Sequence, residues 1–398
     1  MTFRVAISGL NAAQADLAAT ANNIANGSTV GFKASRVQFA ELYAGAAVGS
    51  GVKVAAVNQQ FSQGAINFTD SNLDLALSGK GFFVVGDAQS RAYTRSGAFK
   101  VDRDGYVVNA AQQRLQAFPP LASGGFNTSS TADIRLPSGE SPPTATGRVD
   151  LTVNLPGNAP VPTKTPFSPT DPATYSHSTA MTVYDSLGAA HTATVYLSKT
   201  ATANTWEKRL YVDGNAVGTP QTLAYSNTGA LVTPASGEIT YPAYTPTTGA
   251  APITLTYDIA SSTQYGNAFS VSAINQDGYT TGRLIGIETN AEGVVQARFT
   301  NGRSESLGQV AIAEFASVDG LQSRGDTSWG ETFASGPALL TSAGSGGVGT
   351  LQSGALEASN VDVTQQLVNM ITAQRNFQAN AKMISTSDAL AQTIINIR

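Results

Sequence analysis

The stretch FRVAISGLNAAQADLAATANNIANG, residues 3–27, decides how the chain begins to fold. Its apolar residues recur at alternating steps of four and three, at Phe3, Ile7, Leu10, Leu17, Ala21 and Ile24, with Gln14 in the remaining stripe position. This spacing predicts an α-helix with a narrow apolar stripe of the kind that packs against another helix. Asn26 and Gly27 are expected to end it, because a glycine just past a helix accepts the left-handed conformation.

The C-terminal stretch, SNVDVTQQLVNMITAQRNFQANAKMISTSDALAQTIINIR, residues 359–398, has the same pattern. The stripe is formed by Val363, Leu367, Met370, Phe377, Ala381 and Ile384, and then shifts onto Leu390, Ile394 and Ile397. Ser359 or Asn360 is expected to cap this second helix. At about 1.5 Å per residue the helix would be roughly 50 Å long.

Two helices alone bury little apolar area against the entropy of ordering roughly 60 residues. We therefore expect them to associate with further copies of the chain, since a head-to-tail contact that does not close generates a filament. The predicted polymerisation seam consists of Ile7, Leu10, Leu17 and Ile24 in the first helix and Leu367, Met370, Phe377, Ile384, Leu390 and Ile394 in the second.

The residues between the helices predict β-structure. Turn signals at Asp104-Gly105, Asp213-Gly214, Asp277-Gly278 and Asn301-Gly302 punctuate apolar and β-branched runs. Residues 253–259 alternate strictly between apolar and polar side chains, as a strand with one wet face does. The fold class is thus mainly β with long helical termini, and its strands are expected to pair antiparallel.

Composition predicts nested, discontinuous domains around the centre of the chain. Pro-rich stretches precede a block of Thr, Tyr and Val strands. The expected parts are a helical inner domain of residues 1–30 and 359–398, a Gly-rich connector of 31–70 and 335–358, a middle β domain of 71–145 and 283–334, and an inserted outer β domain of 146–282. The expected hinge glycines of the connector are Gly45, Gly49, Gly51, Gly344, Gly346, Gly347 and Gly349.

Charge and composition exclude several classes of protein. The 398 residues carry a formal charge of −4 and no run of Lys or Arg, which excludes a nucleic-acid binder. No apolar run approaches the roughly 18 residues that a membrane-spanning helix needs, and we expect no cleavable signal peptide either. The absence of cysteine excludes disulfides and thiol catalysis.

Catalytic constellations are scarce, so an enzyme is the weakest interpretation and no cofactor or metal is expected. His177 and His191 lack a nucleophile or a metal-ligand spacing nearby, and we expect ordinary, partly exposed strand histidines. The GxGxxG pattern at residues 344–349 lacks the strand and helix of a dinucleotide site and is interpreted as linker. Asp102 and Asp104 fit a hairpin turn better than a calcium loop.

Several motifs resemble those of the flagellar rod and hook protein family. ANNIANGSTVGFK, residues 21–33, resembles the N-terminal signature of that family, and residues 69–83 and 93–99 are similar to the β motifs that follow it. Residues 354–362 and 370–380 are similar to its closing signature. The motif residues are Asn22, Asn23, Asn26, Gly31, Phe32, Gly354, Leu356, Glu357, Asn360 and Asp362.

The chain's length, residues 183–188 with Trp206 beyond them, and residues 275–279 leading into 282–284 resemble the hook members of the family rather than the shorter rod members. This resemblance implies a subunit of the extracellular flagellar hook, a curved hollow polymer that acts as a universal joint between rod and filament and as an export channel. It implies as partners further copies of the chain, the distal rod protein, the hook cap, the hook–filament junction proteins and the type III export apparatus. The alternatives are a distal rod protein and a secreted β-rich adhesin.

Overall fold

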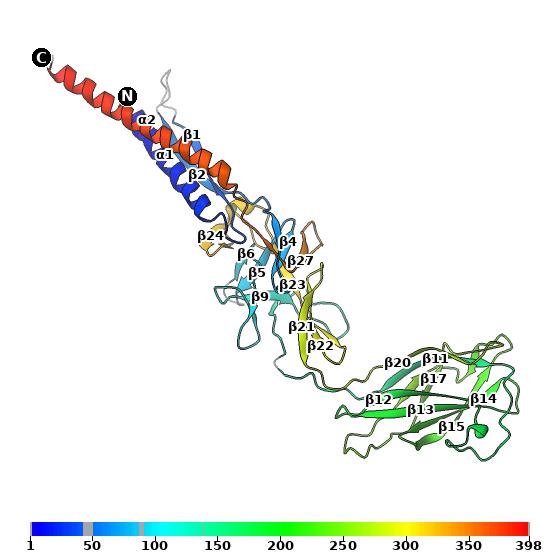
Figure 1. Cartoon of the computed structure of the whole chain (residues 1–398). Helices are drawn as coiled ribbons and strands as arrows, with labels where there is room; N and C mark the ends of the chain where they lie inside the picture. Colours follow the sequence, from blue (N-terminus) through cyan, green and yellow to red (C-terminus); the bar gives the residue numbers. More distant parts are fainter. Residues whose placement is uncertain (1, 43–50, 87–90, 138, 397–398) are drawn as a thin grey trace. The chain divides into compact units, whose positions relative to one another are not determined.

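The computed structural model describes residues 2–42, 51–86, 91–137 and 139–396 (Figure 1). The chain is mainly β, with helix α1 (Thr2–Ala25) at one end and helix α2 (Val363–Asn396) at the other. It divides into two compact units. Unit 1 comprises Met1–Ser138, Ile285–Arg298 and Ser304–Arg398, and unit 2 comprises Gly139–Leu284 and Phe299–Arg303. The helices, the expected connectors and most of the expected middle β segments therefore belong to unit 1, whereas residues 139–145, 283–284 and 299–303 of those segments belong to unit 2.

The ends of the helices differ in detail from the expectation. α1 ends at Ala25 as predicted, but Gly27 is not left-handed; the positive φ, +69°, occurs at Gly31. α2 is capped by Asp362, whose Oδ1 accepts the Gln365 N–H at 3.1 Å, and not by Ser359 or Asn360. Asn360 is occupied elsewhere, because its side chain bonds the backbone of residues 34, 60 and 62. Among the described residues, no helix is long and apolar enough to cross a bilayer.

The segments expected to be loose connectors form strands. β1 (Ser35–Glu41) and β2 (Val52–Gln59) make an antiparallel hairpin that packs beside α1. Two further antiparallel pairs join the N- and C-terminal halves of unit 1: β3 (Ile66–Phe68) with β28 (Ala355–Glu357), and β4 (Leu75–Ser78) with β27 (Thr350–Ser353).

Among the expected hinge glycines that the structure describes, Gly344, Gly346 and Gly347 lie in a turn, and Gly51 and Gly349 are closely packed. The Gly344 N–H donates to the Gly349 carbonyl at 2.9 Å, and Gly344, Gly346 and Gly347 have the positive φ of a turn. A Cβ on Gly349 would lie 2.2 Å from the Ser78 carbonyl oxygen, and one on Gly51 would lie 2.3 Å from Ser8 Oγ. Gly45 and Gly49 fall outside the described residues.

A 12-stranded sheet forms the body of unit 1. Its main path runs β21-β22-β23-β9-β5-β6-β25-β24. The twelve strands are β5 (Phe82–Gly86), β6 (Arg91–Thr94), β7 (Lys100–Val101), β8 (Val107–Val108), β9 (Arg114–Phe118), β10 (Ala132–Asp133), β21 (Leu284–Thr289), β22 (Val294–Phe299), β23 (Ser304–Glu314), β24 (Gln322–Gly325), β25 (Ser328–Gly330) and β26 (Leu339–Ser342). An aromatic core lies against it, in which Phe82 contacts Phe61, Phe315 and Trp329 edge to face.

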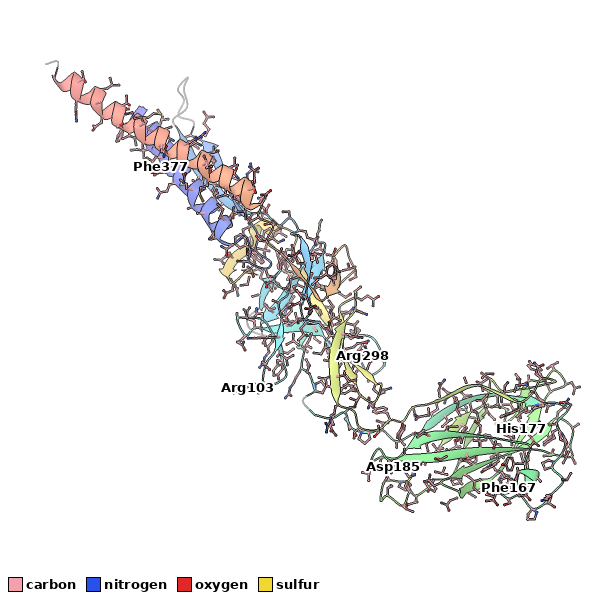
Figure 2. The ribbon with its side chains drawn as sticks, in the orientation of Figure 1. Arg103, Phe167, His177, Asp185, Arg298 and Phe377 are labelled. Atoms are coloured by element: carbon pink, nitrogen blue, oxygen red, sulfur yellow. The ribbon has the colours of Figure 1, made fainter. Side chains whose placement is uncertain are left out.

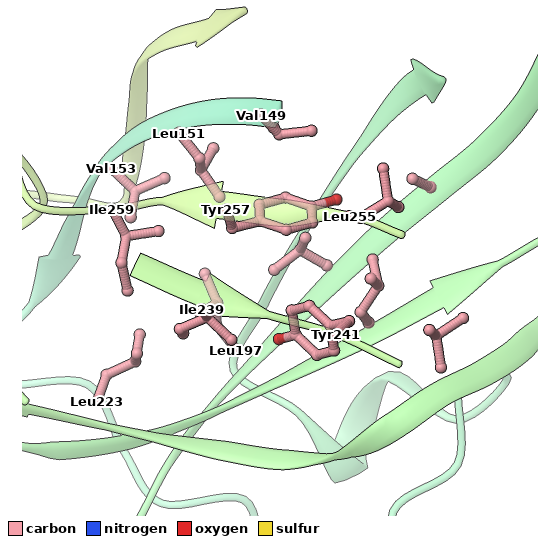
Figure 3. Packing of buried hydrophobic residues seen from close by; sticks show 14 of the residues in the cluster. Val149, Leu151, Val153, Leu197, Leu223, Ile239, Tyr241, Leu255, Tyr257 and Ile259 are labelled. Carbon is pink, nitrogen blue, oxygen red and sulfur yellow. The ribbon is translucent and has the colours of Figure 1, made fainter. Parts of the chain in front are cut away.

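Two five-stranded sheets build unit 2. One contains β11 (Arg148–Pro156), β17 (Glu238–Thr240), β18 (Thr256–Asp258), β19 (Thr263–Tyr265) and β20 (Ser270–Gln276). The other contains β12 (His177–Tyr184), β13 (Ala190–Lys199), β14 (Thr205–Val212), β15 (Asn215–Tyr225) and β16 (Leu231–Thr233). Inward-facing side chains of both sheets form one apolar cluster, in which Tyr241 and Tyr257 are the labelled aromatic residues of Figure 3.

The expectation of purely antiparallel pairing is wrong in unit 2. β11 pairs parallel with β18 and with β19, and antiparallel with β20. A parallel pair needs a long crossover connection, and the whole second sheet lies between β11 and β18 in the chain.

Three of the four turn signals mark hairpins. Asp104-Gly105 joins β7 to β8, Asp213-Gly214 joins β14 to β15, and Asn301-Gly302 joins β22 to β23. Asp277-Gly278 instead packs against the start of β11, where Asp277 Oδ1 accepts the N–H groups of residues 147 and 148. The alternation over residues 253–259 is confirmed, since Ile253, Leu255, Tyr257 and Ile259 are buried and the residues between them are not.

Candidate polymerisation surface

The two terminal helices pack side by side within unit 1 (Figure 1). Small residues stand where they meet: Ala6 and Ala13 of α1 and Ala373 of α2 are buried. A Cβ on Gly9 would lie 2.6 Å from Asn380 Oδ1, so the absence of a side chain allows α2 to approach closely. Small residues therefore form the contact between α1 and α2. Several larger apolar side chains of the two helices stay partly exposed to solvent.

The predicted seam residues fall into two groups. Leu10, Leu17, Ile24, Met370, Phe377 and Ile384 are half-buried in the subunit. Phe377, labelled in Figure 2, shares a face of α2 with Ala373 and Asn380. The second group stays in solvent: Ile7 is 38% exposed, Leu367 47% and Leu390 60%. The side chain of Ile394 lies outside the described residues.

Other exposed apolar side chains enlarge this second group. Phe3 and Val363 belong to the stripes noted in the sequence, whereas Val368, Ile371 and Met383 stand outside the heptad and were missed. Val368 and Ile371 are 53% and 51% exposed. The sequence does contain a signal for these three residues, because they are apolar although they lie outside the heptad stripe of α2. We call Phe3, Ile7, Val363, Leu367, Val368, Ile371, Met383 and Leu390 the helix surface.

A buried ionic cluster lies in unit 1 below the helices. Glu357 accepts a bond from Lys33 Nζ at 2.6 Å and another from Arg95 Nη1 at 3.2 Å, and the Glu357 and Lys33 side chains are fully buried. Gly64 N–H donates to the same carboxylate at 2.9 Å. Burial lowers the pKa of Lys33 and of Arg95, and the carboxylate opposes both shifts. Four segments that are distant in the sequence therefore meet at this carboxylate.

Asparagines of the family motif continue this junction up to the helices. Asn23 Oδ1 accepts the Ser35 N–H at 2.8 Å, and Asn23 Nδ2 donates to Gln366 of α2 at 3.2 Å. Asn360 Oδ1 accepts the Ala34 N–H at 2.8 Å. Asn26 Nδ2 donates to the Asn22 carbonyl of α1 at 3.0 Å. The motif residues thus fasten the bases of both helices to the hairpin β1–β2.

The remaining motif residues have backbone or packing roles here. Gly31 N–H donates to the Glu357 carbonyl at 2.8 Å, and a Cβ on Gly31 would lie 2.4 Å from the Ser96 nitrogen. Gly354 has a positive φ of 68°, and Phe32 and Leu356 are half-buried. A cavity of about 640 Å³ beside the junction is lined by both polar and apolar residues, among them Asn22, Asn26 and Phe32.

His177 has the expected environment, a partly exposed position on strand β12, whereas His191 does not. His191 is buried, with Nδ1 2.6 Å from Asp213 Oδ2 and Nε2 3.2 Å from Asp185 Oδ2. Burial disfavours its charged form, but the two carboxylates outweigh burial and raise the pKa of His191. His177 is half-buried and stacks on Phe269 at 4.5 Å, and burial lowers its pKa. Figure 2 labels His177 and Asp185 in unit 2.

Carboxylates and histidines show no metal-binding arrangement in the described part of the chain. Asp102 has the expected turn role, because its Oδ1 accepts the N–H groups of Asp104 and Tyr106 at 2.9 and 2.8 Å.

Family models match four stretches of the chain, and residues 34–75 and 280–351 lie between them. Residues 3–33 match the family described as flagella basal body rod protein, and residues 76–158 match the flagellar hook protein FlgE/F/G D1 domain. Residues 154–279 match the flagellar basal body protein FlaE D2 domain. Residues 352–397 match the flagellar basal body rod FlgEFG protein C-terminal family.

Individual relatives are similar over their full length. The chain is 40% identical over 409 residues to the flagellar hook protein FlgE of Salmonella typhimurium strain LT2, with 100% of both chains covered. It is 39% identical over 411 residues to that of Escherichia coli K12, again with 100% coverage of both. The crystal structure of Helicobacter pylori hook protein FlgE2 shares the fold, with a TM-score of 0.55, 14% identity, and coverage of 73% of this chain and 100% of that one. The chain therefore belongs to the flagellar hook protein family.

Proposed function

We propose that the chain, as a structural subunit of the bacterial flagellar hook, polymerises through α1 and α2 into a hollow tube. The role of hook subunit and the location at the hook follow from membership in the family. The observation that supports the mode of assembly is the helix surface, whose large apolar side chains are exposed although the helices are already paired. Covering each of them in a polymer would contribute up to about 1.5–3 kcal/mol.

The geometry of the helix surface favours further copies of the chain as its cover. Val363, Leu367 and Ile371 follow one another at steps of four along α2, which places them on one side of the helix. Phe3 and Ile7 repeat that step on α1. Two apolar rows on a helix pair match what a ring of parallel helix pairs would bury, so we assign α1 and α2 to the inner wall of the tube, around the export channel.

The buried junction suits the transmission of torque. The ionic cluster of Glu357, Lys33 and Arg95 and the Asn23 and Asn360 bonds connect the helices to the β-structure of unit 1 without a loose linker. In this assignment unit 1 carries the load and unit 2 forms the outer layer. Polar surfaces of unit 2 would exchange contacts between neighbouring copies while the hook turns through its bend.

Further proposals concern partners and export. The same helix surface would join the distal rod protein at one end of the polymer and the hook–filament junction proteins at the other, with the hook cap guiding growth. The subunit would leave the cell unfolded through the flagellar type III apparatus, without a cleavable signal peptide. These partners fit a non-enzymatic, structural role.

Electron microscopy of the purified full-length chain tests the assembly. With increasing protein concentration, or in sulfate, which strengthens apolar burial, the chain is expected to form hollow tubes. A chain without residues 2–25 and 363–398 should remain monomeric under the same conditions, because it lacks the helix surface. A full-length chain that stays monomeric throughout, or a shortened chain that forms the same tubes, would contradict the proposal.

A further inference from the structure

Phe333 stands fully exposed in the turn between β25 and β26 of unit 1, with 105% of its reference area open to solvent. Single exposed apolar residues are common, but most keep part of their surface against the protein. Phe68, another exposed phenylalanine of this unit, is 77% exposed. The Phe333 ring therefore contributes no packing within unit 1.

The turn that carries Phe333 is held by hydrogen bonds on both sides of it. Thr332 Oγ1 donates to the Gly320 carbonyl at 2.6 Å and accepts the Ala334 N–H at 3.1 Å. The fully buried Ser335 hydroxyl donates to the Thr332 carbonyl at 2.9 Å, and it accepts the Thr332 N–H at 2.9 Å. The backbone beneath the ring is therefore fixed before any partner arrives.

Close packing keeps the turn in place as well. A Cβ on Gly320 would lie 2.5 Å from the backbone of residues 334 and 335, so the turn rests directly on the short 3-10 helix at Val318–Gly320. On the strand that follows, Leu339 is 65% exposed and adds apolar surface. A rigid backbone that presents an aromatic ring binds at low entropic cost, because only the ring rotamer needs ordering.

We propose that Phe333 is an anchor by which each subunit contacts a neighbouring copy in the polymer, where the ring becomes buried in an apolar surface. This inference rests on the proposed function, since only polymerisation surrounds each chain with identical copies. Aromatic side chains are enriched at the buried centres of protein interfaces. In such a contact, the Phe333 ring of one copy binds a different surface of the next copy. A head-to-tail contact of this kind can repeat from copy to copy without forming a closed ring.

The test compares the lowest protein concentration at which polymer sediments. Phe333→Ala is expected to raise that concentration at least tenfold while the melting temperature of the monomer stays unchanged, because the ring packs against nothing there. Phe333→Leu should restore most of the assembly. Phe68→Ala, which removes a comparable exposed ring from β3, is the matched control and is expected to polymerise at the wild-type concentration.

A photoreactive phenylalanine analogue at position 333 identifies the partner. Crosslinks between two copies, formed in polymer and absent from monomer, support the inference. Crosslinks within one chain, a Phe333→Ala chain that polymerises at the wild-type concentration, or an equal loss in Phe68→Ala would overturn it. A wild-type chain that fails to polymerise refutes the proposed function instead, so the two failures are distinguishable.

Discussion

Among single residues, Glu357 shows how one buried charge can organise distant parts of the chain. Its carboxylate meets Lys33, 324 residues away in the sequence, and Arg95, 262 residues away. Both partners lie within the motif stretches 21–33 and 93–99, but the sequence pattern did not predict that their charges would meet Glu357. A charged residue inside an otherwise small or apolar motif is the signal that could have indicated this cluster.

Glu357→Gln should destabilise unit 1 by about 3–5 kcal/mol, because it leaves two buried cations without their counter-ion. Chemical unfolding measures the change when Trp206 is replaced by Phe in both chains compared, so that the fluorescence reports Trp329 in unit 1. Glu288→Gln breaks the exposed pair with Arg298, in which both side chains are more than half exposed, and should change stability by less than about 1 kcal/mol. Equal effects of the two substitutions would contradict the assigned role of Glu357.

The two histidines should titrate on opposite sides of the ordinary value. His191 has a raised pKa, so its contribution to stability is fully present below about pH 6.5 and is lost as pH rises through the pKa of the folded state. His177 has a lowered pKa, so stability grows as pH rises from its folded pKa towards the ordinary value. NMR titration of the two imidazoles measures both, and a His191 midpoint below that of His177 would refute the prediction.

At the scale of elements, the terminal helices show that periodicity predicts a helix well and its partners poorly. The heptad stripe correctly placed α1 and α2, because the repeat of apolar residues is a local property. It did not predict that small residues and Gly9 close the pair, or that Leu367 and Leu390 remain in solvent. How far two helices approach depends on side chains that face each other only after folding.

Phe377→Ala should weaken the pairing of α2 with α1 by about 2 kcal/mol, roughly half of what a fully buried phenylalanine costs, because the ring is half-buried. Circular dichroism of the monomer should then show loss of helix at lower temperature. Gln378→Ala changes the neighbouring exposed residue and should leave the helical signal unaltered. Identical melting of the two variants would show that Phe377 does not hold the pair.

For the whole molecule, the path of the chain between the units permits a clean excision. Ser141 and Gly282 form an antiparallel bridge where the chain enters and leaves unit 2. Replacing residues 142–281 with a short Gly-Ser linker should leave unit 1 folded and able to polymerise. If the polar surface of unit 2 adjusts contacts around the bend, the resulting tubes should be straight. Electron micrographs measure the curvature, and tubes as curved as those of the full chain would refute this role for unit 2.

Local pattern in the sequence was sufficient to predict both helices, three hairpin turns and the alternation of residues 253–259, because each depends on neighbours within a few residues. Motif resemblance was sufficient to predict the family. Folding in three dimensions decided the parallel pairing of β11, the capping of α2 by Asp362, the burial of His191 between two aspartates and the ionic cluster at Glu357. Each of these features depends on long-range pairing or on burial. A local amino-acid pattern indicates that a side chain will be buried, but it does not identify the residues that bury it.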